Sequence, residues 1–186
     1  MGSRSPGPGS PHPPILVIGL GNPILGDDGL GWRVAEVVQQ ALTSQASDFV
    51  EFDFLSLGGL SLMERLVDYE RVVLIDAMNS GQNPVGTVKV FPLEQLPAQA
   101  YGHLSSAHDT SLQNALQVGR RLGARLPDQI VVVAVESPYV YDFSETLTPP
   151  VASALPEAAQ AVITVLRQWT PNLHSQDFSE TRYDIP

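Results

Sequence analysis

The sequence predicts an α/β fold: a single three-layer α/β/α domain around a mostly parallel, twisted sheet of roughly five strands. Short apolar runs alternate along the chain with stretches of helical period, as in a parallel sheet covered by helices on both faces. The clearest runs are β-branched and almost unbroken, as strands buried on both faces are: Ile15–Gly19, Val72–Asp76 and Ile130–Val135. The chain has 186 residues and is 43% hydrophobic, which is enough for the core of one domain.

Other elements are predicted between and beside these strands. Phe49–Leu55 alternates apolar and polar residues and predicts a less buried strand, and Thr87–Phe91 predicts an edge strand. Helices are expected over Leu30 to about Ala41, Leu60 to about Val67, Asp109 to about Leu122, and from Pro149 or Val151 to Trp169. The last of these contains Pro156, which predicts a kink or a later start of the helix.

The two ends of the chain differ in composition from the rest. Residues 1–14 are rich in Pro, Gly and Ser and predict a disordered arm, while the polar residues 171–186 predict a flexible tail. The folded domain is therefore expected over residues 15–170. The first residues lack the apolar core of a secretory signal and no apolar run is long enough to span a bilayer, so we expect a cytoplasmic protein without a membrane partner.

Charge and cysteine content narrow the range of possible functions. The net charge of −10 and the pI near 4.6 argue against binding to nucleic acid or to an anionic membrane, because both would be repelled. Cations and basic peptides are not excluded. The chain has no cysteine, so every nucleophile or metal ligand must be an oxygen or an imidazole nitrogen.

A glycine-rich turn follows the first strand, in "ILVIGLGNPILGDDGLG". A dinucleotide fingerprint would need its third glycine at position 24, which is Ile24. In a phosphate-binding P-loop, Gly21 and Gly26 would have the right spacing, but Asp27 and Asp28 stand where that loop requires Lys and Ser or Thr. Two carboxylates repel a phosphate, so the turn is predicted to bind a cation.

The same aspartates have a purely structural interpretation. Asp27 or Asp28 could cap the helix that begins near Leu30, because an acidic side chain accepts hydrogen bonds from the free N–H groups there. Two adjacent aspartates are more than one cap requires. We therefore expect one of them to cap the helix and the other to be available for binding.

A third aspartate, Asp76, closes a buried strand. In a doubly wound sheet, ligands bind outside the carboxyl ends of the strands, where the glycine turn also lies. A partly desolvated carboxylate at this edge needs a backbone donor, a cation or a metal as its partner. The alternative interpretation is an aspartate that initiates the following turn.

The histidines supply the remaining candidate ligand. His12 and His174 lie in the terminal segments, whereas His103 and His108 lie in "AYGHLSSAHDTSL" before a predicted helix. Two carboxylates and one imidazole could bind a divalent first-row metal, although a histidine in a loop is more commonly solvated surface. The chain contains neither a G-x-S-x-G elbow nor an H-E-x-x-H motif, which argues against the common nucleophilic and zinc hydrolases.

Three segments together resemble one family. "GLGNPILGDDGLGWRVAE", "VVLIDAM" and "SSAHDTSL", in this order, resemble the [NiFe]-hydrogenase maturation proteases, endopeptidases that trim the hydrogenase large subunit. The resemblance implies that Asp28, Asp76 and His108 bind nickel. Asp28 and Asp76 are also the candidate catalytic carboxylates of an aspartyl-type endopeptidase. His103 matches no ligand position.

The resemblance also implies the substrate and the origin of the metal. The partner would be the precursor of a large subunit, which carries the nickel on its own cysteines and loses a short C-terminal extension, and the protease itself would have no resident metal. Separately, we expect the protease to be a monomer. Water would be activated either by nickel as a Lewis acid or by a carboxylate as a base. Asn22, Gly21 and the amides around Gly58 and Gly59 are candidates for positioning the substrate backbone, unless they serve only tight turns.

Two departures from the family pattern bear on the site. Asp28 occupies a position where the family often has Glu, and Leu57 occupies one where many members have Asp. Two other hypotheses follow from the same residues. One is a metallohydrolase with its own divalent ion, and the other is a non-catalytic module that senses nickel.

Overall fold

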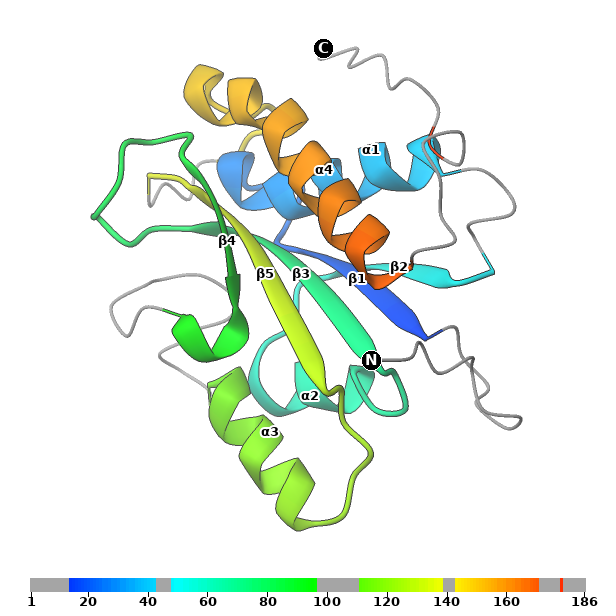
Figure 1. Ribbon diagram of the computed structural model, residues 1–186. Coiled ribbons are helices and arrows are strands. Elements are labelled where there is room, and N and C mark those ends of the chain that lie inside the picture. Colours follow the sequence, from blue (N-terminus) through cyan, green and yellow to red (C-terminus); the bar gives the residue numbers. More distant parts are fainter. Residues whose placement is uncertain (1–13, 43–47, 97–110, 139–142, 171–177, 179–186) are drawn as a thin grey trace.

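The computed structural model describes residues 14–42, 48–96, 111–138, 143–170 and 178. Its centre is a five-stranded sheet in the order β2-β1-β3-β5-β4 (Figure 1). The strands are β1 (Ile15–Leu20), β2 (Val50–Leu55), β3 (Arg71–Met78), β4 (Val88–Pro92) and β5 (Gln129–Glu136). The pairings of β1 with β2, β1 with β3 and β3 with β5 are parallel, and β4 joins β5 antiparallel. The predicted sheet is confirmed, including the weakly buried β2 and the edge strand β4.

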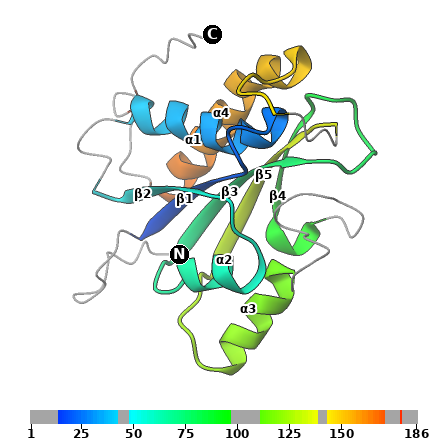
Figure 2. The same cartoon turned by 180° about the vertical axis from the view of Figure 1, so that it is seen from behind.

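Helices cover both faces of this sheet and complete the predicted three layers. They are α1 (Leu30–Ala41), α2 (Gly59–Arg65), α3 (Leu112–Arg121) and α4 (Pro149–Trp169), with short 3-10 helices η1 (Gly26–Gly29) and η2 (Leu93–Gln95). Helices α1 and α4 pack together on one face, and α2 and α3 pack together on the other (Figures 1 and 2).

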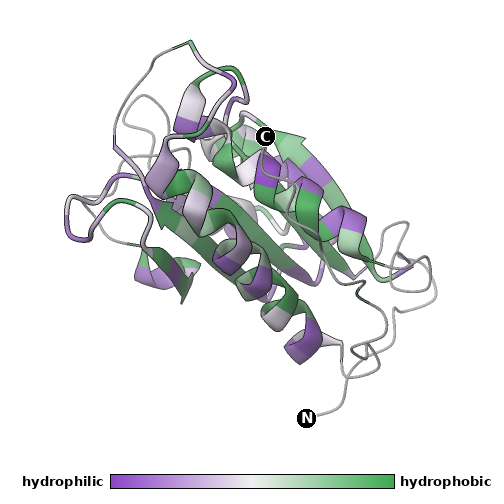
Figure 3. Cartoon of the chain, turned by 90° about the horizontal axis from the view of Figure 1, so that it is seen from above, coloured by the Kyte–Doolittle hydropathy of each residue, from purple (hydrophilic) through white to green (hydrophobic). Residues whose placement is uncertain are grey.

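The unbroken apolar run of β1 follows from this layering. Ile15 and Val17 belong to the core beneath α1 and α4, whereas Leu16 and Ile18 belong to the core beneath α2 and α3. Successive side chains of a strand point to opposite faces, so a strand covered on both faces needs an apolar residue at every position. Viewed from above, the strands are largely hydrophobic between helices whose outer surfaces are more polar (Figure 3).

The strand order places a topological switch point between β1 and β3. After β1 the chain moves to β2 on one side, and it then returns to β3 on the other side of β1. In open parallel sheets, ligands bind at the carboxyl ends of the two strands that flank such a point. The glycine turn follows β1 and Asp76 lies in β3, so the fold brings both predicted features to this edge.

The start of α3 differs from the sequence prediction, whereas α4 starts at Pro149 as predicted. Helix α3 begins at Leu112 because Ser111 is its N-cap, with a hydroxyl that accepts a backbone N–H of the first turn at 3.3 Å. The predicted start, Asp109, lies outside the described residues. Helix α4 runs without a break from Pro149, so the later start that we inferred from Pro156 is wrong.

One residue of the predicted tail, Phe178, is described and packs on the domain. It is 8% exposed, forms an isolated antiparallel bridge with Leu42, and has the guanidinium of Arg167 4.8 Å above its ring. In the described part of the chain, no helix is both long and apolar enough to cross a bilayer.

Candidate functional site

Glycines bring the start of α1 into backbone contact with the ends of β1 and β3. A Cβ atom on Gly31 would overlap the carbonyl oxygens of Leu20 and Ile75, and one on Gly19 would lie 2.5 Å from the carbonyl oxygen of Gly31. Only glycine permits so close an approach of helix and strand. The glycines therefore place the acidic turn directly at the switch point.

Gly21 folds the turn back between η1 and the end of β2. Its φ of +127° lies in a region that side chains disfavour, and a Cβ atom would overlap the carbonyl oxygen of Asp28. Its N–H donates to the carbonyl of Leu55 at 3.0 Å, and its own carbonyl accepts the hydroxyl of Ser56 at 2.5 Å. The turn after β1 is thus joined to the loop after β2.

Asp28 is partly buried and closes this turn from the other side. One of its carboxylate oxygens accepts the N–H of Asn22 at 2.7 Å, and the side-chain oxygen of Asn22 accepts the N–H of Ile24 at 3.2 Å. Asn22 thus shapes the turn through its backbone N–H and its side-chain oxygen. The side chain of Asp28 is long enough to reach the N–H of Asn22, six positions earlier in the chain.

Asp27 is turned inward. It is 4% exposed, and its carboxylate accepts both the N–H and the hydroxyl of Thr148, at 2.6 and 2.8 Å. The expected capping of the helix at Leu30 is wrong, because η1 precedes α1 and makes Gly29 the N-cap of α1. Asp27 instead binds Thr148, the N-cap residue of α4.

Asp76 is buried inside β3, at 2% exposure, and is not a turn residue. The pairing of β3 with β5 continues through Met78, so the interpretation of Asp76 as a turn-initiating residue is wrong. Gly19 of β1 pairs with Ile75, the residue before Asp76, and η1 contacts β3. The structure therefore brings Asp76 and the turn that carries Asp28 to the same edge of the sheet.

The predicted histidines, His103 and His108, lie outside the described residues. Among the residues that the structure describes, no group of three or more His, Asp or Glu side chains is arranged to hold a metal ion. Of the predicted nickel ligands Asp28, Asp76 and His108, the structure thus describes the two aspartates. Binding of nickel by these residues stays a prediction.

Sequence reasoning missed another buried carboxylate at this edge, that of Glu136. It is 3% exposed and accepts the N–H groups of Ser80 and Gly81, at 2.8 and 2.9 Å, and the hydroxyl of Ser80 at 2.6 Å. Glu136 therefore fixes the loop that follows Asp76. Its signal was present in the sequence, since Glu136 ends an apolar run as Asp76 does.

The segment before α4 lies against the glycine turn. Ser144 donates its N–H to the carbonyl of Ile24 at 3.1 Å and accepts the N–H of Gly26 at 2.6 Å. Leu25 and Ser144 form an isolated parallel bridge. Together with the bonds between Asp27 and Thr148, these contacts hold the acidic turn to the chain after β5.

A second polar cluster, around Arg65, joins α2 to the edge strand β2. Arg65 donates to Asp53 at 2.5 Å, to Glu51 at 2.6 Å and to the hydroxyl of Tyr69 at 2.7 Å. Burial raises the pKa of the Tyr69 hydroxyl above its ordinary value. Every charged group of the cluster that is described here has a partner within it, so we assign it to packing rather than to the site.

Comparisons with known proteins agree on one family. Residues 32–165 match the model of the HycI family, described as hydrogenase maturation protease. The chain is 30% identical over 159 residues to the hydrogenase expression/formation protein HupD of Rhizobium leguminosarum bv. viciae, covering 86% of this chain and 77% of that protein. It is 29% identical over 154 residues to the hydrogenase 2 maturation protease of Escherichia coli K12, covering 83% of this chain and 91% of that protein.

The fold is also similar to solved structures. The hydrogenase maturating endopeptidase HybD of Escherichia coli superimposes with a TM-score of 0.68 at 27% identity, covering 84% of this chain and 93% of that one. This likeness supports the α/β architecture independently of the short motifs on which the resemblance was first based.

Proposed function

The chain belongs to the hydrogenase maturation protease family, and from this premise we propose that it recognises nickel in a [NiFe]-hydrogenase precursor and removes a C-terminal extension. The chain is therefore an endopeptidase, and its substrate would be the precursor of the large subunit. The observation that carries the proposal is the meeting of two acidic features, the turn that bears Asp28 and the buried Asp76, at one switch point of the sheet.

The nature of these groups supports a cation as the recognised feature. Asp76 is 2% exposed, and a carboxylate in such surroundings is stabilised by a nearby positive charge. Oxygen ligands and one imidazole would hold a free nickel ion only moderately. A nickel ion already held by thiolates of the precursor would have its coordination completed by Asp28, Asp76 and His108, so that the metal serves as part of the substrate.

The two neighbouring aspartates of the turn take different roles in this proposal. The carboxylate of Asp27 is occupied by Thr148, whereas Asp28 is partly buried and lies in the turn itself. A glutamate side chain at position 28 would be one methylene longer. Because Asp28 accepts the N–H of Asn22 within its own turn, its shorter side chain is held in a defined position.

The residues alone are also compatible with two other functions. One is a metallohydrolase with a permanently bound divalent ion, and the other is a nickel-sensing module that does not cut. Membership of a protease family favours the processing of a precursor over both of them.

The decisive experiment compares nickel-loaded and nickel-free precursor as substrates. Purified large-subunit precursor in each state is incubated with the protein, and intact mass spectrometry follows the loss of a C-terminal peptide. We expect shortening of the nickel-loaded precursor only. Equal cleavage of both forms would contradict nickel recognition, and no cleavage of either would favour the binding module.

A further inference from the structure

Large apolar side chains are exposed around the turn that carries Asp28. Ile24 is 46% exposed, Leu57 38%, Leu60 44% and Phe143 87%; we call these four residues the apolar rim. They belong to the turn after β1, to the loop and helix after β2, and to the segment before α4. Exposed apolar side chains that gather in one region indicate a binding surface, whereas scattered ones need no explanation.

Hydrogen bonds place the rim on both sides of the acidic turn. On one side, Ser144, the neighbour of Phe143, exchanges backbone hydrogen bonds with Ile24 and Gly26. On the other side, Ser56, the neighbour of Leu57, donates to the carbonyl of Gly21. The apolar side chains therefore flank the same short segment that presents Asp28.

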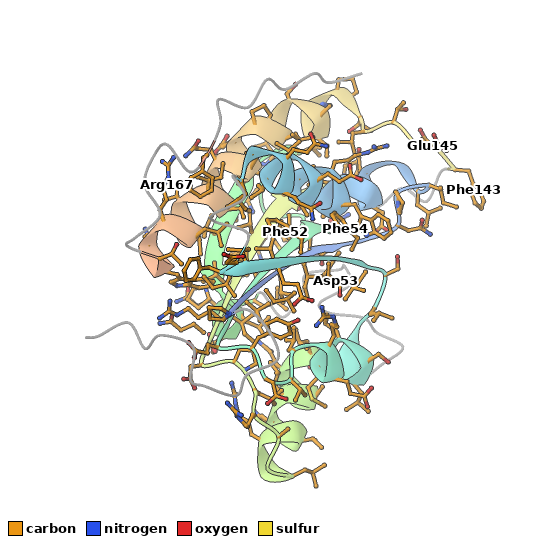
Figure 4. The ribbon with its side chains drawn as sticks, turned by 90° about the vertical axis from the view of Figure 1, so that its right-hand side faces the viewer. Phe52, Asp53, Phe54, Phe143, Glu145 and Arg167 are labelled. Carbon is orange, nitrogen blue, oxygen red and sulfur yellow. The ribbon has the colours of Figure 1, made fainter. Side chains whose placement is uncertain are left out.

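The backbone near Phe143 and Leu57 is also held in position. The bonds of Ser144, and those of Thr148 with Asp27, fix the backbone on the C-terminal side of Phe143. Next to Leu57, the carbonyl of Leu55 accepts the indole N–H of Trp32 at 3.4 Å. Phe143 points away from the body of the molecule at the end where Glu145 also lies (Figure 4). An aromatic ring that is 87% exposed, on a backbone held by hydrogen bonds on its C-terminal side, is typical of an anchor in an interface.

We infer that the apolar rim binds an apolar segment of the precursor polypeptide, and so contributes affinity that does not depend on nickel. This inference rests on the proposed function, since it takes the precursor as the occupant. Charge argues against a second copy of the chain as the occupant. The chain carries a net charge of −10, and Glu145 and Asp28 add negative charge beside the rim, so two copies repel each other.

The test measures binding to a precursor that cannot be processed. The probe is the nickel-free hydrogenase large-subunit precursor of the same organism, titrated by calorimetry into the wild-type protein and into Phe143→Ser. We expect the dissociation constant to rise roughly tenfold in this variant, because an aromatic anchor is lost. Phe143→Leu keeps an apolar side chain and should recover most of the affinity.

The matched control is Leu122→Ser. Leu122 is 82% exposed, like Phe143, but it is the C-cap of α3, which leads into the amino end of β5 and thus lies at the opposite edge of the sheet. The Leu122→Ser variant should bind the precursor with the same affinity as the wild type. Equal affinity of Phe143→Ser and wild type, or equal weakening by both serine variants, would overturn the inference.

Two further outcomes separate this inference from its premise and from self-association. If sedimentation shows that the wild type dimerises and Phe143→Ser does not, the rim is a contact between copies and the inference is wrong. If the wild type fails to shorten the nickel-loaded precursor but Phe143→Ser still weakens binding tenfold, the proposed processing is wrong. The inference that the apolar rim binds the precursor is then still supported.

Discussion

At the scale of single residues, the adjacent aspartates of the acidic turn have opposite surroundings. Asp27 is buried against Thr148, and Asp28 remains partly exposed beside Asn22. The sequence predicted that one aspartate would cap the helix at Leu30 and that the other would be available for binding. The capping is wrong, because Asp27 binds Thr148 instead, and binding by Asp28 stays a prediction. The partner of Asp27 could not be predicted, because Thr148 follows it by 121 positions and meets it only through the packing of α4 on α1.

The first prediction concerns Asp27. Asp27→Ala leaves the N–H and hydroxyl of Thr148 without their acceptor, and should lower the free energy of unfolding by about 2 kcal/mol. Thr148→Val removes only the hydroxyl bond and should cost about 1 kcal/mol. Urea unfolding followed by circular dichroism measures both. A cost for Asp27→Ala no larger than that for Thr148→Val would show that the bond to the Thr148 N–H contributes little.

The second prediction concerns Asp76. Asp76→Asn keeps the shape of the side chain and removes its charge, and we expect processing of nickel-loaded precursor to fall at least about a hundredfold, as for other groups that act on a reacting centre. Intact mass spectrometry over time gives the rate. Asp128→Asn removes a charge from an exposed side chain just before the amino end of β5, at the opposite edge of the sheet, and serves as the control, with an unchanged rate. Normal processing by Asp76→Asn would refute its assigned role.

At the scale of elements, each strand was predicted to within two residues at either end, because β-branched runs covered on both faces leave a clear pattern. Helices α1 and α4 have the predicted bounds, whereas the ends of α2 and α3 differ from the prediction. Asp109 was chosen as the start of α3, although Ser111 accepts the capping hydrogen bond. Competing polar residues before a helix cannot be ranked without the backbone geometry.

The third prediction compares two glycines within helices. Gly31→Ala would press a methyl group on the carbonyl oxygens of Leu20 and Ile75, which cannot move, and should cost about 3 kcal/mol. Gly119→Ala meets only the flexible side chains of Met63 and Leu126, and the gain in helix propensity of up to about 1 kcal/mol offsets that contact. Thermal unfolding of both variants is the measurement, and equal melting temperatures would contradict the close packing of α1.

The fourth prediction concerns the loop after β3. Glu136→Ala removes the acceptor of the Ser80 and Gly81 N–H groups, so these amides should exchange with solvent at least about tenfold faster, since each lost bond opens the loop locally. Hydrogen exchange by NMR resolves them individually. The amide of Leu74 in the middle of β3 serves as an internal control and should keep its protection.

At the scale of the whole molecule, the strand order decides where the site can form. The sequence predicted the sheet and its carboxyl edge, which was enough to place Asp76 and the glycine turn together. It did not predict how the segment after β5 is tied to that turn, because those contacts join elements distant in the chain. The family comparison covers most of the domain and agrees with this architecture.

The fifth prediction follows from the role of nickel as part of the substrate. Protein purified without precursor should contain far less than one equivalent of nickel or any other divalent metal, because oxygen ligands and an imidazole bind such ions only moderately. Inductively coupled plasma mass spectrometry measures the content. A full equivalent that survives dialysis would instead favour a metallohydrolase with its own ion.

The hydrogen bonds of Asp27 to Thr148 also set the order in which the protein can become active. Thr148 stands near the end of the domain, so a chain still emerging from the ribosome has the glycine turn long before it has the partner that holds this turn. Contacts between such distant residues form late in folding, since a long loop must first be closed. Hydrolytic competence should therefore arise only after nearly the whole domain has been synthesised.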